Sequence, residues 1–301
     1  PATGHEYGRI GLAINERLDD IALRARVLYV YAMFVHHWNE HWSTLTPWFH
    51  DGIEAGYQSG DLLYLAYSAQ DCVIWDPTLD LPEATRRHEE NLEIVRECDY
   101  RDSLDSATLF LQMQYALQGR THDACSLSDD RFDESACLAG MRARQFMTGV
   151  ANYHIYKAEV CFLHDQPERA LDHLEDQSRL IRSAMSLPQL VRFYLIDFLA
   201  NVSCFPDRAR REDDPVAQRL QRDLSRIRRW ADNCPENFRH LQYLMEAELH
   251  RAAGRSATAM ECFDTAIATA GENCFRRDEA MACERAAACL ELPLWRAVVR
   301  T

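Results

Sequence analysis

Helical periodicity interrupted by turn signals is the feature that most constrains how this chain can fold. Apolar residues recur at helical spacing between positions 241 and 252, and again between 260 and 270. Each set places one apolar stripe on the face of a predicted helix. Gly254 lies between the two stripes, where a left-handed residue would end the first helix. The stripes consist of Leu241, Leu244, Met245, Leu249 and Ala252, and of Met260, Phe263, Ala266, Ile267 and Ala270.

The turn signals recur at intervals of about 40 residues. Asp-containing junctions begin at positions 18, 59 and 98, so they are 41 and 39 residues apart. Aspartate is a good N-cap, so each junction suits the start of another helix. Later breaks fall at 186–188, 233–235 and 272–274. A period near 40 that is split into two helices is typical of helix-turn-helix arrays. We therefore expect an all-α superhelix, a solenoid of about 13 or 14 helices without strands.

The organisation expected from these signals is one helical-repeat domain over residues 1–301. The first helix, roughly Tyr7 to Leu18, resembles the second half of a pair whose first half is missing. An irregular loop is expected near 119–133 and a charged connection near 208–214. The sequence begins at Pro1 without an initiator methionine, and we interpret it as a fragment of a larger, multidomain protein.

Small residues at fixed spacing form a repeat motif. The clearest copy combines Ala247, Gly254 and Ala259-x-x-x-Phe263-x-x-Ala266. The alanines would let two antiparallel helices approach closely, and Phe263 would fill the space toward the next pair. This pattern resembles the tetratricopeptide repeat. A second copy places Ala158, Asp165, Ala170 and Leu174 at corresponding positions.

Longer strings, at 35–40, 230–240, 246–249 and 259–267, carry a further resemblance that covers about Leu18 to Ala288. They are similar to the helical-repeat segment of large bacterial multidomain signalling proteins. In that family a protein-kinase-like module and a predicted STAND-type ATPase precede the repeats, and GAF, histidine-kinase or cyclase modules often follow. The chain departs from the family at 290–293, where Leu-Glu-Leu-Pro is expected to interrupt the last helix.

Composition argues against several classes of function. The formal net charge of −14 disfavours nucleic acid and anionic membranes as partners. The longest apolar run, Val27 to Val35, is nine residues, whereas a membrane span needs about 20. Eleven cysteines without a Cys-x-x-Cys pair indicate buried free thiols in a reducing, cytoplasmic setting. The cysteines at core-like helical positions are Cys72, Cys161, Cys262, Cys283 and Cys289.

Aromatic residues are concentrated between positions 29 and 75. Most of them suit the core between repeats, but tyrosine and tryptophan are also favoured in grooves that bind peptides or ligands. We expect part of this region to line such a groove on the concave face of the solenoid. The candidate binding residues are Tyr31, His37, Trp38, His41, Trp42, Trp48, Tyr67 and Trp75.

Two strings could instead hold a metal. Asp129-Asp130-x-x-Asp133 has the spacing by which class I terpene synthases hold Mg²⁺, although it also suits a loop that leads to a helix N-cap. His37 and His41 would share a face if they lay on one helix, and packing or capping is the alternative. We favour the alternatives in both cases, and expect neither a metal nor a cofactor.

These observations predict a non-catalytic protein-interaction or sensory relay module. It would bind a protein, a peptide or a small effector, or adjacent modules of the same polypeptide. The sequence contains no Gly-x-x-x-x-Gly-Lys-Ser/Thr loop and no Gly-x-Ser-x-Gly elbow, and its one lysine is Lys157. The alternative function is a Mg²⁺-dependent all-α diphosphate lyase that uses Asp129, Asp130 and Asp133.

Overall fold

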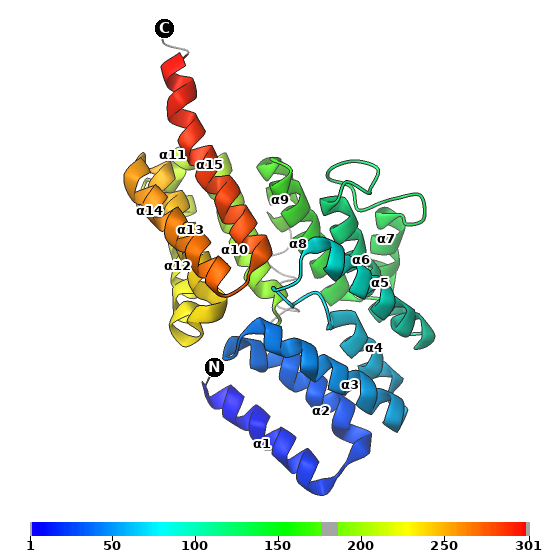
Figure 1. The fold of residues 1–301 in the computed structure, drawn as a ribbon. Helices are drawn as coiled ribbons and strands as arrows, with labels where there is room; N and C mark the ends of the chain where they lie inside the picture. The colour runs from blue at the N-terminus through cyan, green and yellow to red at the C-terminus, as the bar shows by residue number, and fades with distance from the viewer. Residues whose placement is uncertain (1, 176–185, 299–301) are drawn as a thin grey trace. The chain divides into compact units, whose positions relative to one another are not determined.

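The computed structural model describes residues 2–175 and 186–298, and it divides the chain into two compact units. The first unit is Pro1–Phe193 and the second is Tyr194–Thr301. The described residues are helical apart from their connections and contain no β-strand, which confirms the all-α class (Figure 1). One domain over 1–301 stays a prediction. Within the described ranges, no helix is both long and apolar enough to cross a membrane.

The helices of the first unit are connected mostly by short turns. They are α1 (Ala2–Leu18), α2 (Ile21–Phe34), the 3₁₀ helices η1 (His36–Trp38) and η2 (Trp42–Thr44), α3 (Leu45–Ser59), α4 (Leu62–Asp71), α5 (Leu81–Glu97), α6 (Arg101–Leu117), α7 (Glu134–Ala143), α8 (Met147–Leu163) and α9 (Pro167–Glu175). The longest described connection without a helix joins α6 to α7.

Helix α10 (Gln189–Cys204) begins in the first unit and continues into the second. The remaining helices are α11 (Pro206–Ala209), α12 (Pro215–Asn233), α13 (Pro235–Ala252), α14 (Ser256–Glu272) and α15 (Arg276–Val298). The described residues thus form 15 α-helices, more than the sequence suggested, and α11 has only four residues. The expected interruption at 290–293 is wrong, because α15 continues to Val298.

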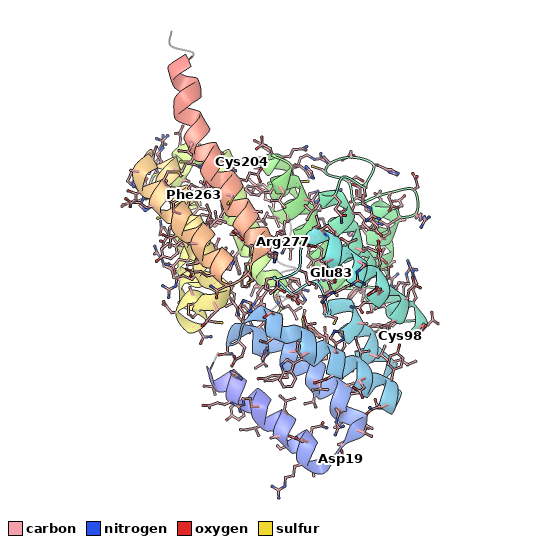
Figure 2. All side chains as sticks on the ribbon, in the orientation of Figure 1. Asp19, Glu83, Cys98, Cys204, Phe263 and Arg277 are labelled. Carbon is pink, nitrogen blue, oxygen red and sulfur yellow. The ribbon has the colours of Figure 1, made fainter. Side chains whose placement is uncertain are left out.

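The three periodic junctions share one geometry. Asp19, Gly60 and Asp99 have φ values of 48°, 74° and 51°, in the left-handed region. Such a residue reverses the chain direction after a helix. The Asp20 carboxylate then accepts from the backbone N–H groups of Ala22 and Leu23 to cap α2, and Asp61 caps α4 in the same way. Asp19 is labelled at the first of these turns (Figure 2).

Close approach between helices depends on small residues. In the first unit α3 packs against α4, and a methyl group at Gly56 would lie 2.6 Å from Cβ of Leu65 and 3.0 Å from its Cα. Because the nearest of these atoms are backbone or next to it, only glycine fits there. Ala158 and Ala170, in α8 and α9, are also fully buried.

In the second unit, α13 packs against both α12 and α14, and α14 packs against α15. Gly254 has φ 73° in the turn after α13. The buried side of this helical arrangement includes the residues of the sequence motif. Their exposed fractions are 1% or less: Ala247, Ala259, Phe263 and Ala266.

The cysteines are only partly buried as expected. Cys72, Cys161 and Cys289 are buried, and Cys262 is half-buried. The prediction is wrong for Cys283, which is exposed on α15. Cys283 is two residues from the buried Met281, a step that places the two side chains on roughly opposite sides of an α-helix with 3.6 residues per turn.

The close packing of α14 can be tested with a matched pair of substitutions. Ala259→Leu places extra methylene groups where the exposed fraction is 0%, so we expect a loss of about 1–3 kcal/mol in stability. Ala268→Leu makes the same change at an exposed position of the same helix and should leave stability nearly unchanged. Urea unfolding followed by circular dichroism measures both; equal effects would contradict the packing.

Candidate functional site

A pocket of about 530 Å³ lies between α1, α2 and α3 of the first unit. We call it the α1–α3 pocket. Its volume is within the range of small-molecule sites, about 300–1,000 Å³. Its lining residues are Leu12, Asn15 and Glu16 of α1, Arg24 and Leu28 of α2, and Trp48, Asp51, Glu54, Ala55 and Gln58 of α3.

The packing of the first three helices explains the pocket. Helix α1 packs against α2, and α2 packs against α3 on another side, so α2 forms the floor. The three helices lie side by side at the N-terminal end of the first unit (Figure 1). Along α3, the lining residues from Trp48 to Gln58 recur at three- or four-residue steps and therefore share one face. At 1.5 Å per residue, this wall is about 15 Å long.

Some polar groups of the pocket are already paired with each other or with nearby groups. Arg24 forms an ion pair with Asp19 at 2.9 Å, and the Gln58 amide donates to Glu54 at 3.0 Å. The amide nitrogen of Asn15 donates to the carbonyl oxygen of Asp20 at 2.8 Å. That bond holds the end of α1 onto the turn before α2.

Trp48 is the one predicted binding residue among those that line the pocket. Its ring is half-buried and contacts Tyr31 edge-on at a centroid distance of 5.0 Å. The ring of His36 lies 5.7 Å from that of Trp48. Burial lowers the pKa of His36 to about 4, so this imidazole is neutral at pH 7. Trp48 is therefore held from one side by a packed, uncharged cluster.

The other predicted binding residues belong mainly to the interior. Tyr31, His37, Trp42 and Trp75 are buried. Trp38, His41 and Tyr67 are half-buried and lie outside the pocket lining. Trp42 packs edge-on against Trp75, and Tyr67 stacks on Tyr29. The structure brings these rings together as the core between helices.

A buried carboxylate lies within this aromatic core. Asp71 is fully buried and accepts hydrogen bonds from the Tyr29 hydroxyl at 2.9 Å and the Trp75 indole at 3.3 Å. Burial raises the pKa of its carboxyl to about 6, although these hydrogen bonds and one from Gln70 oppose the shift. The carboxylate therefore fixes the orientation of two aromatic rings at an electrostatic cost.

The histidine string does not have the geometry that a metal edge requires. His37 is in η1, whereas His41 lies between the two 3₁₀ helices and accepts from Ser43 N–H as a cap. The premise that they share one α-helical face is wrong. Burial lowers the pKa of His37 to about 3. Within residues 2–175 and 186–298, no group of three or more His, Cys, Asp or Glu side chains is arranged to hold a metal.

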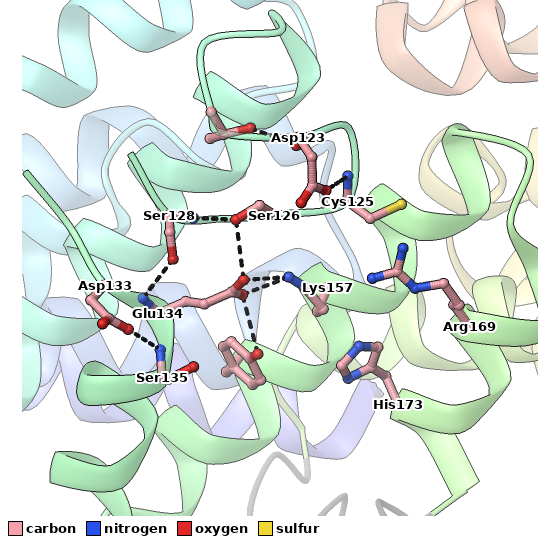
Figure 3. Close-up of polar contacts among 12 residues, drawn as sticks. Asp123, Cys125, Ser126, Ser128, Asp133, Glu134, Ser135, Lys157, Arg169 and His173 are labelled. Carbon is pink, nitrogen blue, oxygen red and sulfur yellow. Dashed lines mark hydrogen bonds and ion pairs between the residues drawn. The ribbon is translucent and has the colours of Figure 1, made fainter. Parts of the chain in front are cut away.

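The acidic string forms a turn at Asp129 and a helix cap at Asp133, and Figure 3 shows the cap. Asp129 accepts from the backbone N–H groups of Arg131 and Phe132 at 2.8 and 2.9 Å. Asp133 caps α7 by accepting from Ser135 and Ala136 at 2.8 and 3.1 Å. The Asp130 side chain is fully exposed beside His122. The three carboxylates thus perform separate local tasks, as the loop-and-cap interpretation expects.

Lys157 anchors the loop before α7. From α8 it donates to both carboxylate oxygens of Glu134 at 2.6 Å, while Ser126 and Tyr153 donate to the same carboxylate (Figure 3). Both charged side chains are nearly buried, so removing either would leave an uncompensated charge. This network ties the loop to α8 and explains the lysine without a ligand.

Most of the residues that line the α1–α3 pocket were not predicted from the sequence. Asp51, Glu54 and Gln58 form a polar stripe with Trp48 at steps of three or four residues, which is a readable signal. Asn15, Glu16 and Arg24 come from other helices, and only the packing of α1 and α2 brings them to the same place.

Comparison of the chain with models of known protein families gives no match, and comparison with curated proteins gives none either.

The buried Asp71 predicts a dependence of stability on pH. Its folded-state pKa of about 6 lies above its ordinary value of 3.8, so the folded chain binds this proton more tightly. The contribution of Asp71 is therefore most favourable below about pH 4 and is lost as pH rises toward about 6. Asp71→Asn should gain stability relative to wild type over this range. Urea unfolding at several pH values measures the difference, and exposed Asp264→Asn is the control. A stability difference between Asp71→Asn and wild type that does not change with pH would contradict the prediction.

The two roles within the acidic string predict unequal effects on stability. Asp133→Ala removes the N-cap of α7 and should cost about 1 kcal/mol. Asp130→Ala, three residues away, removes an exposed carboxylate and should leave the unfolding midpoint unchanged. Thermal unfolding with and without Mg²⁺ and inorganic diphosphate adds a second readout. A stabilisation by these ions that both substitutions abolish would favour the lyase alternative.

Proposed function

We propose that this chain is a non-catalytic recognition and relay module, a tetratricopeptide-like helical array that binds its ligand in the α1–α3 pocket. The observation that carries the proposal is the pocket itself, which combines a 15 Å helical wall, estimated above, with Trp48 and polar side chains of three helices. The ligand is a small effector or an exposed segment of a peptide or protein.

Binding in the pocket has a physical route to the rest of the unit. Helices α1 and α3 both pack against α2, and a ligand between them would add contacts to both. A ligand that binds only the folded arrangement stabilises it by RT ln(1 + [L]/Kd), about 2.7 kcal/mol at a hundredfold excess over Kd. Within the described residues α1 packs extensively only against α2, so its stability is the property that ligand binding would change most.

The resemblance of some sequence strings to bacterial multidomain signalling proteins suggests which part of a longer polypeptide would respond to such a change. In a longer polypeptide with kinase-like, ATPase or sensory modules, a more stable α1 would alter the packing available to the adjacent module. From this resemblance we infer a cytoplasmic signalling role in which this chain itself catalyses no reaction.

The proposal is tested by nuclear magnetic resonance on the ¹⁵N-labelled chain with a fragment set that contains cations, anions and neutral molecules. The Trp48 indole N–H signal is assigned from its loss in Trp48→Phe. At least one fragment should shift this signal, and hydrogen exchange in residues 2–18 should slow with that fragment present. If fragments shift other indole signals and none shifts that of Trp48, the pocket is not the binding site.

A further inference from the structure

Helices α1 and α2 present apolar side chains to solvent on one side of their hairpin. We propose that this surface, the α1–α2 face, binds the same face of a second copy of the chain. The two copies would be related by a two-fold axis, with each helix antiparallel to its counterpart. The inference concerns assembly and therefore goes beyond the function proposed above. The residues of the α1–α2 face are Tyr7, Ile10, Ile14 and Leu18 of α1, and Leu23, Val27, Val30 and Phe34 of α2.

The α1 residues of this face are exposed although α1 already has a packed side. Their exposed fractions lie between 52% and 71%, and steps of three or four residues place them in one stripe. The packed side of α1 meets α2 at Gly8, where a methyl group would lie 2.8 Å from the Tyr31 ring. An apolar stripe is the part of a surface helix that normally faces a core, and exposed apolar patches mark interaction sites. The second stripe of α1 therefore indicates a second packing contact.

The stripes of α1 and α2 lie on the same side of the helix pair. On α2, the face residues other than Val27 are 39% to 43% exposed. At about 100° of rotation per residue, each stripe is a quarter to a third of a turn from the side that contacts the other helix. On both helices this turn leads away from the pocket residues Leu12 and Leu28. The α1–α2 face is thus one two-helix surface opposite the α1–α3 pocket, and a second copy bound there would leave the pocket open.

The order of residues along α1 suits a two-fold axis. In an antiparallel pair of identical helices, two residues lie opposite each other when their midpoint is at the axis. The midpoint of Ile10 and Ile14 is residue 12, and the midpoint of Tyr7 and Leu18 is between residues 12 and 13. One axis would therefore place Ile10 against Ile14 and Tyr7 against Leu18 of the other copy. Each contact would occur twice, as an isologous interface requires.

The stripe of α2 has its midpoint at the same level of the hairpin. Its first and last residues, and the two between them, are both centred between residues 28 and 29. Residues 12 and 28 lie at one level, because Leu12 and Leu28 line the same pocket and Gly8 contacts Tyr31 one turn further along. A single axis can therefore pass both midpoints. It would place α1 against α1 and α2 against α2 of the other copy.

Charges beside the α1 stripe match this arrangement. Glu6 and Arg17 are both exposed, and they lie on the same side of α1 because 11 residues make about three turns. Their midpoint is between residues 11 and 12, so Glu6 of each copy would lie level with Arg17 of the other. Within residues 2–175 and 186–298 neither side chain forms an ion pair. Parallel copies would bring like charges together, so the charge pattern favours an antiparallel second copy.

The size of the face sets the strength of the contact. Helices of 17 and 14 residues are about 25 and 21 Å long, and packed helices lie about 10 Å apart, so this pair presents about 500 Å². Two copies would bury about 1,000 Å², which is near the lower limit for a specific interface. We therefore expect a reversible dimer whose population depends on concentration.

The test is sedimentation equilibrium of the full chain at about 1–200 µM, which should show a monomer–dimer equilibrium. Ile10→Glu with Ile14→Glu places four carboxylates in the contact and should weaken it at least about a hundredfold, so this variant should be monomeric. The matched control is Tyr57→Glu with Leu62→Glu, which changes similarly exposed apolar residues of α3 and α4 and adds the same charge. Its dimer affinity should stay within about twofold of wild type. Circular dichroism checks that both variants keep their helical content.

Charge reversal tests the antiparallel arrangement separately. Glu6→Arg alone, or Arg17→Glu alone, should weaken the dimer about fivefold, because each change replaces two ion pairs by like charges. The two changes together restore opposite charges and should bring the affinity back to within about twofold of wild type. A dimer that the single reversals leave unchanged, or that the double reversal does not restore, would overturn the inference.

Equal weakening by the face variant and its control would overturn it as well. So would a chain that stays monomeric over the whole concentration range, which would leave the face to a different protein. The proposed function is decided independently by the Trp48 indole signal, because the pocket and the α1–α2 face lie on opposite sides of the helix pair.

Discussion

The closeness of helix–helix contacts is the constraint on which the rest of this structure depends. At Gly56, where α3 passes α4, even a methyl group would lie within 3.0 Å of the Leu65 backbone. In the second unit, Ala259 and Phe263 of α14 are completely buried. Since interiors are packed to crystal-like density, these positions allow little change in side-chain volume. They fix how neighbouring helices cross, and therefore which side chains face one another.

The α1–α3 pocket exists where this close packing is incomplete. Helix α3 is locked to α4 through Gly56 and to α2 on another side, so its wall of the pocket is rigid. Helix α1 packs against α2, and near its end Asn15 bonds to Asp20. The two walls thus differ in how firmly they are held. A ligand that contacts both walls would hold α1, the less constrained wall, against α3, the more constrained one.

The sequence predicted the helical class and the turns well because both depend on local chemistry. Left-handed residues followed by capping carboxylates at 19–20 and 60–61 are readable from a few neighbouring residues. The lining of the α1–α3 pocket was predicted less well, because aromatic content does not say which rings face inward. Trp42 and Trp75 pack edge-on against each other in the core, whereas Trp48, from the same aromatic region of the sequence, lines the α1–α3 pocket. Its partners Asn15 and Glu16 are more than 30 residues away in sequence, and only tertiary packing unites them.

Under the proposed function, helical walls would allow recognition and relay to reside in one place. Because the backbone of a helix is hydrogen-bonded internally, a ligand between two helices is recognised entirely through side chains. The binding energy of a ligand in the α1–α3 pocket would then be divided between the two helices that form its walls, α1 and α3. Thermodynamic linkage makes this coupling reciprocal: any module that packs against α1 and stabilises it must raise the affinity of the pocket for its ligand by the same factor. Between α3 and α4 no ligand could be placed in this way, since at Gly56 the contact with Leu65 leaves no room even for a methyl group.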